Sequence, residues 1–277
     1  MKIKKAVITA AGPGQQHLPL QTLVSPNGDT KTAIAFLLDE IFANGIESAA
    51  IIIAPGSERD FTNAIGDHLP KVRFIEQAEP RGYGHAVLCA EEFAGEDRIL
   101  LMLGDHLYLN QGNESCLSQF LAVANQTEGA ISAVQPAHES KLPLYGTVGG
   151  QRVSGSNGLY EVSTVLEKPT PTVAEQELIV PGLRSGNYLC FFGMHVINTS
   201  VMKHLAESAA SQNPLLLSPS LHATAQNENY LACEIDGIRF NIGEPHGLLR
   251  AQLGMALAGE SRDEVMASII ELIAMTR

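Results

Sequence analysis

The sequence predicts an α/β fold, with a Rossmann-like, doubly wound mixed sheet and a small antiparallel β insertion. The run from Ala6 to Ala11 carries no charge and no helical period, which is typical of a strand buried on both faces. Strand-like and helix-like segments then alternate through the first half, which favours parallel pairing. From Tyr145 the pattern changes to short alternating strands and turns, which indicates an antiparallel hairpin.

The elements of the first half follow from apolar periodicity and from turn residues. A helix is expected from Thr32 to Asn44, because apolar residues recur at helical spacing and Gly45 follows as a C′ glycine. The most apolar strand, residues 98–103, ends at Gly104 and Asp105. The other expected elements are strands at 49–53, 72–75 and 130–134 and helices at 58–66, 85–93 and 116–125.

The second half is expected to begin with the hairpin and to end with two helices. Between them we expect a loop from Pro169 to Val180, strands at 188–197 and 230–235, and helices at 199–211, 245–258 and 262–275. We interpret residues 1–277 as a single domain with two halves, residues 1–140 and residues 141–277.

Composition and charge exclude several classes of protein. The net charge of −12 argues against a nucleic-acid partner, which demands a basic face. No run of about 18 or more apolar residues marks a membrane span. The lysine-bearing N-terminus passes from a short apolar run into Gly12 and polar residues, so we interpret it as a core strand rather than a signal peptide. Four scattered cysteines without a C-x-x-C pair favour a reducing, cytoplasmic location.

The loop after the first strand is a candidate phosphate site. Gly12, Pro13 and Gly14 follow the strand and lead into a long polar loop from Gln15 to Thr30. Backbone N–H groups at such a strand end can bind an anion, and long loops are often functional. The loop is neither a P-loop nor a dinucleotide fingerprint, and a purely structural turn is the alternative interpretation.

Two further strand ends carry candidate ligand groups. Gln77 precedes Pro80, Gly82 and Gly84, so an amide side chain and a close-approaching backbone could hold a pyrimidine base. The alternative is an ordinary βα loop with a solvated glutamine. Asp105 follows the most apolar strand, where open α/β sheets bind their ligands, and a carboxylate there is a natural Mg²⁺ ligand or, alternatively, an N-cap.

A fourth candidate lies at the end of the hairpin. Glu167 offers an acceptor for sugar hydroxyls, Lys168 offers a cation for a phosphate, and Pro169 ends the strand. A solvated ion pair is the alternative interpretation.

Together these segments resemble the sugar-1-phosphate nucleotidylyltransferases, most closely the bacterial UTP:glucose-1-phosphate uridylyltransferases. The resemblance extends over nearly the whole chain and keeps the order and rough spacing of the motifs. The matching segments are KAVITAAGPG, DTKTAIAFLLDEIFANGI, RGYGHAVLCA after Gln77, LLMLGDHL around Asp105, LYGTV around Gly146, VLEKP at Glu167 and Lys168, FFGMHVI at Gly193 and FNIGEPHG at Asn241.

The resemblance implies a reaction, a cofactor and a set of site residues. In such enzymes the sugar phosphate attacks the α-phosphorus of UTP or dTTP and releases pyrophosphate, with Mg²⁺ and cations neutralising charge. The fold implied is the nucleotide-diphospho-sugar transferase type, and the closing helices would suit a homo-oligomer, as in relatives. The implied nucleotide-binding residues are Ala10, Ala11, Gly12, Gly14, Gln77, Gly82, Gly84 and Asp105; the sugar-binding residues are Gly146, Glu167, Lys168 and Asn187; the metal ligands are Asp105 and Asn241; and the catalytic residues are Asp105 and Lys168.

The sequence departs from the family pattern where the chemistry lies. The family signature G-x-G-T-R-x-x-P-x-T-K reads GPGQQHLPLQT here, so Gln15 and Gln16 replace Thr and the catalytic Arg, and Thr22 replaces a Lys. A second family Lys has no counterpart in SPNGDT, and the second metal-binding Asp of the family is Asn241. The remaining cations that could oppose a triphosphate are Lys31, Arg81 and Lys168.

Two functions of different classes therefore remain open from the sequence. The first is an enzyme that makes a UDP-sugar, chiefly UDP-glucose, and pyrophosphate from UTP and a sugar 1-phosphate. The alternative is a catalytically inactive or weakened homologue, a pseudoenzyme that binds a nucleotide or sugar nucleotide as a regulatory or assembly subunit.

Overall fold

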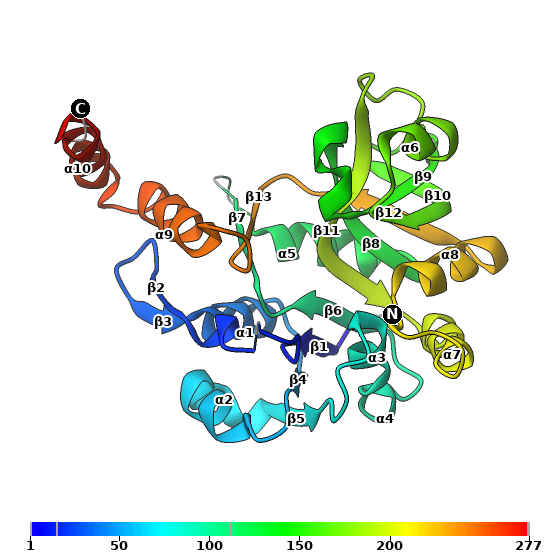
Figure 1. The fold of residues 1–277 in the computed structure, drawn as a ribbon, viewed down its shortest axis with the longest axis horizontal. Helices are drawn as coiled ribbons and strands as arrows, with labels where there is room; N and C mark the ends of the chain where they lie inside the picture. Colours follow the sequence, from blue (N-terminus) through cyan, green and yellow to red (C-terminus); the bar gives the residue numbers. More distant parts are fainter. Residues whose placement is uncertain (1, 15, 111, 113, 276–277) are drawn as a thin grey trace.

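A computed structural model describes residues 2–14, 16–110, 112 and 114–275, and it has the mixed α/β architecture that the sequence predicts (Figure 1). The described part of the chain forms a nine-stranded sheet of order β5-β4-β1-β6-β11-β8-β12-β10-β9. Its strands are β1 (Lys5–Thr9), β4 (Ser48–Ile53), β5 (Val72–Glu76), β6 (Ile99–Leu103), β8 (Ala130–His138), β9 (Gly146–Arg152), β10 (Leu159–Glu167), β11 (Asn187–Ile197) and β12 (Tyr230–Glu234).

The first four strands of this order pair in parallel, as the alternation of strands and helices predicts. Strand β1 pairs in parallel with β4 on one side and with β6 on the other, and β4 pairs in parallel with β5. Strand β11 then runs antiparallel to β6 and β8, which makes the sheet mixed. Because β1 and β6 are neighbours that point the same way, their carboxyl ends meet at one edge, where ligands of open α/β sheets bind.

Helices cover both faces of the sheet. The described helices are α1 (Ala33–Ala43), α2 (Glu58–Ile65), α3 (Tyr83–Leu88), α4 (Glu91–Ala94), α5 (Cys116–Ala124), α6 (Pro171–Glu177), α7 (Thr199–Ser208), α8 (Ser218–Asn227), α9 (Gly247–Ala258) and α10 (Arg262–Met275), with 3₁₀ turns η1 (Leu18–Leu20), η2 (Gly66–Lys71) and η3 (Glu139–Leu144). Buried side chains of α1, α2, α5 and α9 join one core cluster, and those of α3, α4, α7 and α8 join the other.

The first strand illustrates why its sequence shows no alternation. Ala6 and Ile8 belong to one core cluster, whereas Val7 belongs to the opposite one, and all three are completely buried. A strand with apolar neighbours on both faces needs apolar side chains at every position.

The predicted antiparallel hairpin is confirmed. Strands β9 and β10 pair antiparallel, and Gly146 lies opposite Glu167 in their register. The hairpin is not a separate sheet, because β10 also pairs with β12 and β9 with β11, so it extends the main sheet at the end opposite β5 (Figure 1).

The prediction of a loop from Pro169 to Val180 is wrong, because residues 171–177 form α6. Thr170 caps this helix by accepting a hydrogen bond from the N–H of Val173, and Pro171 occupies its first turn, where a missing N–H costs nothing. The threonine–proline start signal was present in the sequence, but a short helix with only Ala174 buried gives almost no apolar period.

Other differences concern short elements. Two segments for which no strand was expected pair as β7 (His106–Leu109) and β13 (Ile238–Asn241), and residues 218–227 form α8. The segment expected as one helix at 85–93 is two, α3 and α4. The long polar loop contains η1 and β2 (Thr22–Val24), which pairs with β3 (Thr30–Thr32).

The last helix, α10, extends away from the body of the molecule beyond α9 (Figure 1). No residue of α10 is buried, and its exposed large apolar side chains include Met266, Ile270 and Met275. Within the described residues, no helix is both long and apolar enough to cross a bilayer.

Candidate nucleotide-binding site

A cavity of about 360 Å³ opens at the carboxyl ends of β1 and β6. Seven of the residues predicted from the sequence line it, from both halves of the chain. They are Ala10, Ala11, Gly12, Gln77, Gly82, Asp105 and Lys168, and they are joined by Thr9, Pro13, Pro19, Pro80, Tyr83, Ala86 and Leu103.

The loop after β1 is tied to the sheet by backbone hydrogen bonds. The Ala10 N–H donates to the carbonyl oxygen of Ile52 at 2.8 Å, and the Gly104 N–H donates to that of Thr9 at 2.9 Å. Further along, the Gly14 N–H donates to Oε1 of Gln16 at 3.1 Å. One backbone donor of the loop, the Gly14 N–H, is therefore already paired with the side chain of Gln16. Gln15 lies outside the described residues.

Gln77 is held in a fixed orientation at the cavity wall. Its side chain is 5% exposed, and its Nε2 donates to the carbonyl oxygen of Gly82 at 3.1 Å and lies 3.0 Å from Nδ1 of His85. With its amide nitrogen engaged, the free group of Gln77 is the acceptor Oε1. An acceptor matches the N3–H of uracil or thymine and not the unprotonated N3 of cytosine.

The two glycines of this loop permit close packing against the segment before α8. A Cβ on Gly82 would lie 2.6 Å from the carbonyl oxygen of Leu215, and one on Gly84 would lie 2.8 Å from the carbonyl of Leu216. Gly82 also has φ +103°, which is strained for any residue with a Cβ. Gly84 is buried and is not among the residues that line the cavity.

Asp105 is the carboxylate of the cavity. Burial acts to raise its pKa, but the hydrogen bond and charge of His106, with a smaller effect of Arg239, hold the pKa below the ordinary value. The two side chains are 2.7 Å apart, between Oδ1 of Asp105 and Nδ1 of His106. Asp105 therefore stays ionised and keeps Oδ2 for a ligand. His106 was not predicted from the sequence as a site residue.

The donor set fits a Mg²⁺ ion that is held partly by substrate. Asn241 lies opposite His106 on β13, and the N–H of Ile242 donates to the carbonyl oxygen of Asp105 at 2.9 Å. The Asn241 Oδ1 accepts from the N–H of Gly243 at 2.9 Å and retains a second lone pair. Among the described residues no group of three His, Cys, Asp or Glu could enclose a metal. Mg²⁺ commonly uses one or two protein oxygens plus substrate phosphates.

The predicted sugar side is built on the turn at Glu167 and Lys168. Lys168 has φ +48°, and its N–H donates to the carbonyl oxygen of Tyr145 at 3.2 Å. Oε2 of Glu167 accepts from the Ser218 hydroxyl at 2.5 Å, and a Cβ on Gly146 would lie 3.1 Å from the same oxygen. Gly146 thus leaves room for this carboxylate, and Ser218 fixes it; Ser218 gave no signal in the sequence.

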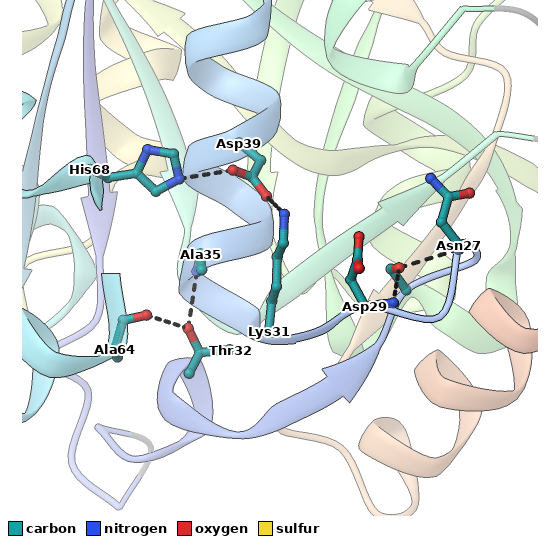
Figure 2. A network of polar contacts seen from close by, with 9 residues as sticks. Asn27, Asp29, Lys31, Thr32, Ala35, Asp39, Ala64 and His68 are labelled. Atoms are coloured by element: carbon teal, nitrogen blue, oxygen red, sulfur yellow. Dashed lines mark hydrogen bonds and ion pairs between the residues drawn. The ribbon is translucent and has the colours of Figure 1, made fainter. Parts of the chain in front are cut away.

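Two of the three candidate cations are engaged elsewhere. Nζ of Lys31 forms an ion pair with Oδ2 of Asp39 at 2.7 Å, and Oδ1 of Asp39 lies 2.8 Å from Nε2 of His68 (Figure 2). Lys31 belongs to β3, and this network holds its side chain against α1, which carries Asp39. The Arg81 guanidinium donates to the carbonyl oxygen of Ala209 at 2.5 Å. Among the described residues that line the cavity, Lys168 is the single cation.

Asn187 lies apart from the other predicted residues. It lines a different cavity with Arg184 and Tyr188, and its Nδ2 donates to the carbonyl oxygens of Arg184 and Ser185, both at 3.4 Å. The structure therefore gives no support to Asn187 as a sugar-binding residue.

Comparisons with known proteins agree with this architecture. In solved structures, the chain is similar to a UTP-bound UGPase from Acinetobacter baumannii, with 22% identity and a TM-score of 0.75 over 98% of this chain and 99% of that one. It is also similar to a UDP-glucose pyrophosphorylase complexed with UDP-glucose, with 22% identity and a TM-score of 0.73 over 90% of this chain and 97% of that one. These two likenesses establish the fold.

Sequence comparison extends the similarity to curated proteins. A UTP–glucose-1-phosphate uridylyltransferase of Bacillus subtilis, YngB, is 29% identical, and one from Streptococcus pneumoniae is 26% identical, each over 98% of this chain and 96% of the relative. The family model described as nucleotidyl transferase matches residues 5–256. Since that match includes every cavity residue described above, the chain belongs to the nucleotidyl transferase family.

Proposed function

We propose that this chain transfers the uridylyl group of UTP to a sugar 1-phosphate, most directly glucose 1-phosphate, and so forms UDP-glucose and pyrophosphate. One observation carries the proposal: a single cavity brings together the acceptor of Gln77, the carboxylate of Asp105 and the cation of Lys168. The names of the curated relatives and of the similar structures support the same substrates.

In this reaction an oxygen of the sugar phosphate forms a bond to the α-phosphorus of UTP. The bond from that phosphorus to the oxygen shared with the β-phosphorus breaks, and pyrophosphate leaves with the electron pair. No covalent intermediate with the protein is required, so the protein contributes positioning and charge.

Each residue contributes through the contacts described above. Gln77 would accept from the N3–H of the base, and Lys168 would oppose the charge of the sugar phosphate. Glu167, held by Ser218, would accept from a sugar hydroxyl. Asp105 with Asn241 would hold Mg²⁺, which when bound neutralises phosphate charge and orients the reacting oxygens. Uracil and thymine both carry an N3–H that could donate to Oε1 of Gln77, so dTTP is a second nucleotide for the test.

A pyrophosphate-release assay tests the proposal. The protein is incubated with Mg²⁺, glucose 1-phosphate and UTP, dTTP or CTP. We expect release with UTP and dTTP and little with CTP, since the unprotonated N3 of cytosine would face the acceptor of Gln77. Equal release with all three would contradict the role of Gln77, and no release above background would contradict the activity.

A non-catalytic sugar-nucleotide binder is the second candidate function. The observation in its favour is that Lys31 and Arg81 are engaged away from the cavity. A triphosphate carries roughly four negative charges, and each fixed cation in phosphoryl transfer can be worth orders of magnitude in rate. Heat of binding for UDP-glucose without any pyrophosphate release would favour this candidate.

A cytoplasmic location is part of either proposal, because all four cysteines are free thiols.

A further inference from the structure

Tyr83 carries a polar group to which the proposed reaction gives no role. It is the first residue of α3, and its ring lines the cavity beside Gly82 and Asp105. Its hydroxyl oxygen is shut off from solvent and has no hydrogen-bond partner among the described residues. Leaving a buried hydroxyl unpaired costs about 1–3 kcal/mol, so such groups are rare in native proteins and call for an explanation.

Three other tyrosines of the described chain have hydroxyl groups with hydrogen-bond partners. The Tyr108 hydroxyl donates to the carbonyl oxygen of Gly193 at 3.1 Å, and the Tyr160 hydroxyl donates to Oε2 of Glu234 at 2.9 Å. The Tyr230 hydroxyl lies 2.6 Å from the hydroxyl of Ser132. Tyr83 therefore differs from these three in having a buried hydroxyl with no partner, and it differs from them too in lining the cavity.

The backbone on both sides of Tyr83 is fixed. The N–H of Gly84 donates to the carbonyl oxygen of Leu215 at 2.9 Å, and the N–H of Leu215 donates to that of Arg81 at 2.7 Å. The glycines before and after Tyr83 pack so closely on this segment that neither has room for a Cβ. The backbone that carries Tyr83 is therefore held in place by contacts on both sides.

The same segment joins Tyr83 to the sugar side of the cavity. Three residues after Leu215, Ser218 donates to Glu167, next to Lys168. The pKa of Tyr83 is raised, first by burial and then by the negative charges of Asp105 and Glu167. The hydroxyl therefore keeps its proton, and it lies close enough to Asp105 and Glu167 for the charges of both carboxylates to act on it.

We propose that Tyr83 is a specificity-determining residue whose hydroxyl donates a hydrogen bond to an oxygen of the sugar-phosphate half of the ligand. This inference rests on the function proposed above for the same cavity. Since the hydroxyl is shut off from solvent in the empty protein, the proposal requires that the Tyr83 side chain turns toward the ligand on binding. A polar group that is unpaired until the correct ligand arrives rejects ligands that lack the matching oxygen.

Calorimetric titration of UDP-glucose and of UDP into three proteins tests the inference. The proteins are the wild type, Tyr83→Phe, which removes only the hydroxyl, and the matched control Tyr230→Phe. For Tyr83→Phe we expect about tenfold weaker binding of UDP-glucose and less than about twofold change for UDP, because UDP lacks the sugar. For Tyr230→Phe both affinities should remain at the wild-type value.

Thermal unfolding of the free proteins supplies a second measurement. Tyr83→Phe should not lower the melting temperature, since it removes no bond of the empty protein, whereas Tyr230→Phe loses the contact with Ser132 and should melt several degrees lower. Destabilisation by Tyr83→Phe with unchanged binding would overturn the inference and assign the hydroxyl a structural role.

The failures of the two proposals are distinguishable. If the wild type binds neither UDP nor UDP-glucose, the proposed function is contradicted, and the role proposed for Tyr83 is contradicted as well. If the wild type binds UDP-glucose and Tyr83→Phe binds it equally well, the role of Tyr83 alone is contradicted. If Tyr83→Phe weakens UDP and UDP-glucose to the same extent, the hydroxyl contacts the nucleotide half, which also contradicts the inference.

Discussion

At the scale of single residues, the cavity has an unusual balance of charge for a triphosphate. Lys168 is the single cation among the described lining residues, and it shares the cavity with the carboxylate of Asp105. On the loop after β1, Gln16 carries no positive charge and instead accepts from the N–H of Gly14. Under the proposed function, the charge of the phosphates would therefore be opposed mainly by Lys168.

Replacing Lys168 should have the largest effect of any single cation. We expect Lys168→Gln to lower kcat/KM for glucose 1-phosphate by about 100-fold or more, because a charged contact to a reacting phosphate is lost. Initial rates of pyrophosphate release measure the effect. The matched control is Lys203→Gln, an exposed lysine on α7. Similar losses in both variants would contradict a role for Lys168 in the cavity.

Restoring a cation on the nucleotide loop should improve the handling of UTP. We expect Gln16→Arg to bind UTP about tenfold more tightly and UDP only slightly more tightly, because the added charge faces the terminal phosphates. The Gly14 N–H also becomes free for an anion. Titration calorimetry in low and high salt measures the gain, which should shrink in high salt. A gain of equal size for uridine would show that charge is not its cause.

At the scale of elements, the loop between β5 and α3, which we propose binds the base, depends on glycine. A Cβ at Gly82 would meet the carbonyl oxygen of Leu215, which is backbone and cannot rotate away. We expect Gly82→Ala to cost about 2–4 kcal/mol of unfolding free energy and to abolish nucleotide binding, from strain and overpacking combined. Urea unfolding and calorimetry measure the two effects.

The control for that variant is another glycine with positive φ. Gly56 has φ +77°, and nothing lies within 4 Å of the position that a Cβ would take. Gly56→Ala should therefore cost only about 1–2 kcal/mol and leave binding intact. If both variants lose the same stability, contact with Leu215 contributes nothing.

Elements with strong apolar patterns were predictable, and short polar ones were not. The strands of the parallel half and helix α1 follow from runs and periods of buried residues. Strands β7 and β13 were missed because they form a two-stranded ribbon that is largely half-exposed, so neither carries a full apolar run. Helix α6 buries a single alanine, and only its cap distinguishes it from a loop.

The site was predictable where its residues stand at strand ends. Asp105 was identified from the rule that open α/β sheets bind their ligands at the carboxyl ends of strands. Gln77 and Lys168 were identified as side chains able to bind a base and a phosphate, each at the end of a predicted strand. Tyr83, Ser218 and His106 were missed, because their roles depend on which segments pack together. The contact between Ser218 and Glu167 joins residues 51 positions apart, and nothing in the local sequence predicts it.

At the scale of the whole molecule, one sheet runs through both halves of the chain. Strand β11 pairs with β6 of the first half and also with β8 and β9. We propose that the two halves unfold as one domain. The bond between Ser132 and His195, 2.5 Å from Oγ to Nδ1, lies in the interior of this shared sheet.

The burial of His195 should make stability depend on pH. Burial lowers the pKa of His195 to about 3, well below the ordinary value of 6.5. Between those pH values the unfolded chain binds a proton that the folded chain does not, so stability should fall as pH drops below about 6.5, by up to about 1.4 kcal/mol per pH unit. Above that pH the group contributes no further change.

Urea unfolding at several pH values measures this slope. We expect His195→Gln to reduce the slope by up to about one proton, whatever its effect on absolute stability, and the exposed His138→Gln to leave the slope unchanged. An unchanged slope in His195→Gln would show that the histidine is not buried in its neutral form.

The proposed function requires that the cavity at the ends of β1 and β6 joins a nucleotide to a sugar phosphate. A ³¹P NMR time course of one mixture of UTP, glucose 1-phosphate, Mg²⁺ and the protein tests this requirement directly. We expect the signals of UDP-glucose and pyrophosphate to grow together in equal amounts while both substrates decline. Constant substrate signals, or loss of UTP without formation of UDP-glucose, would contradict the proposed function.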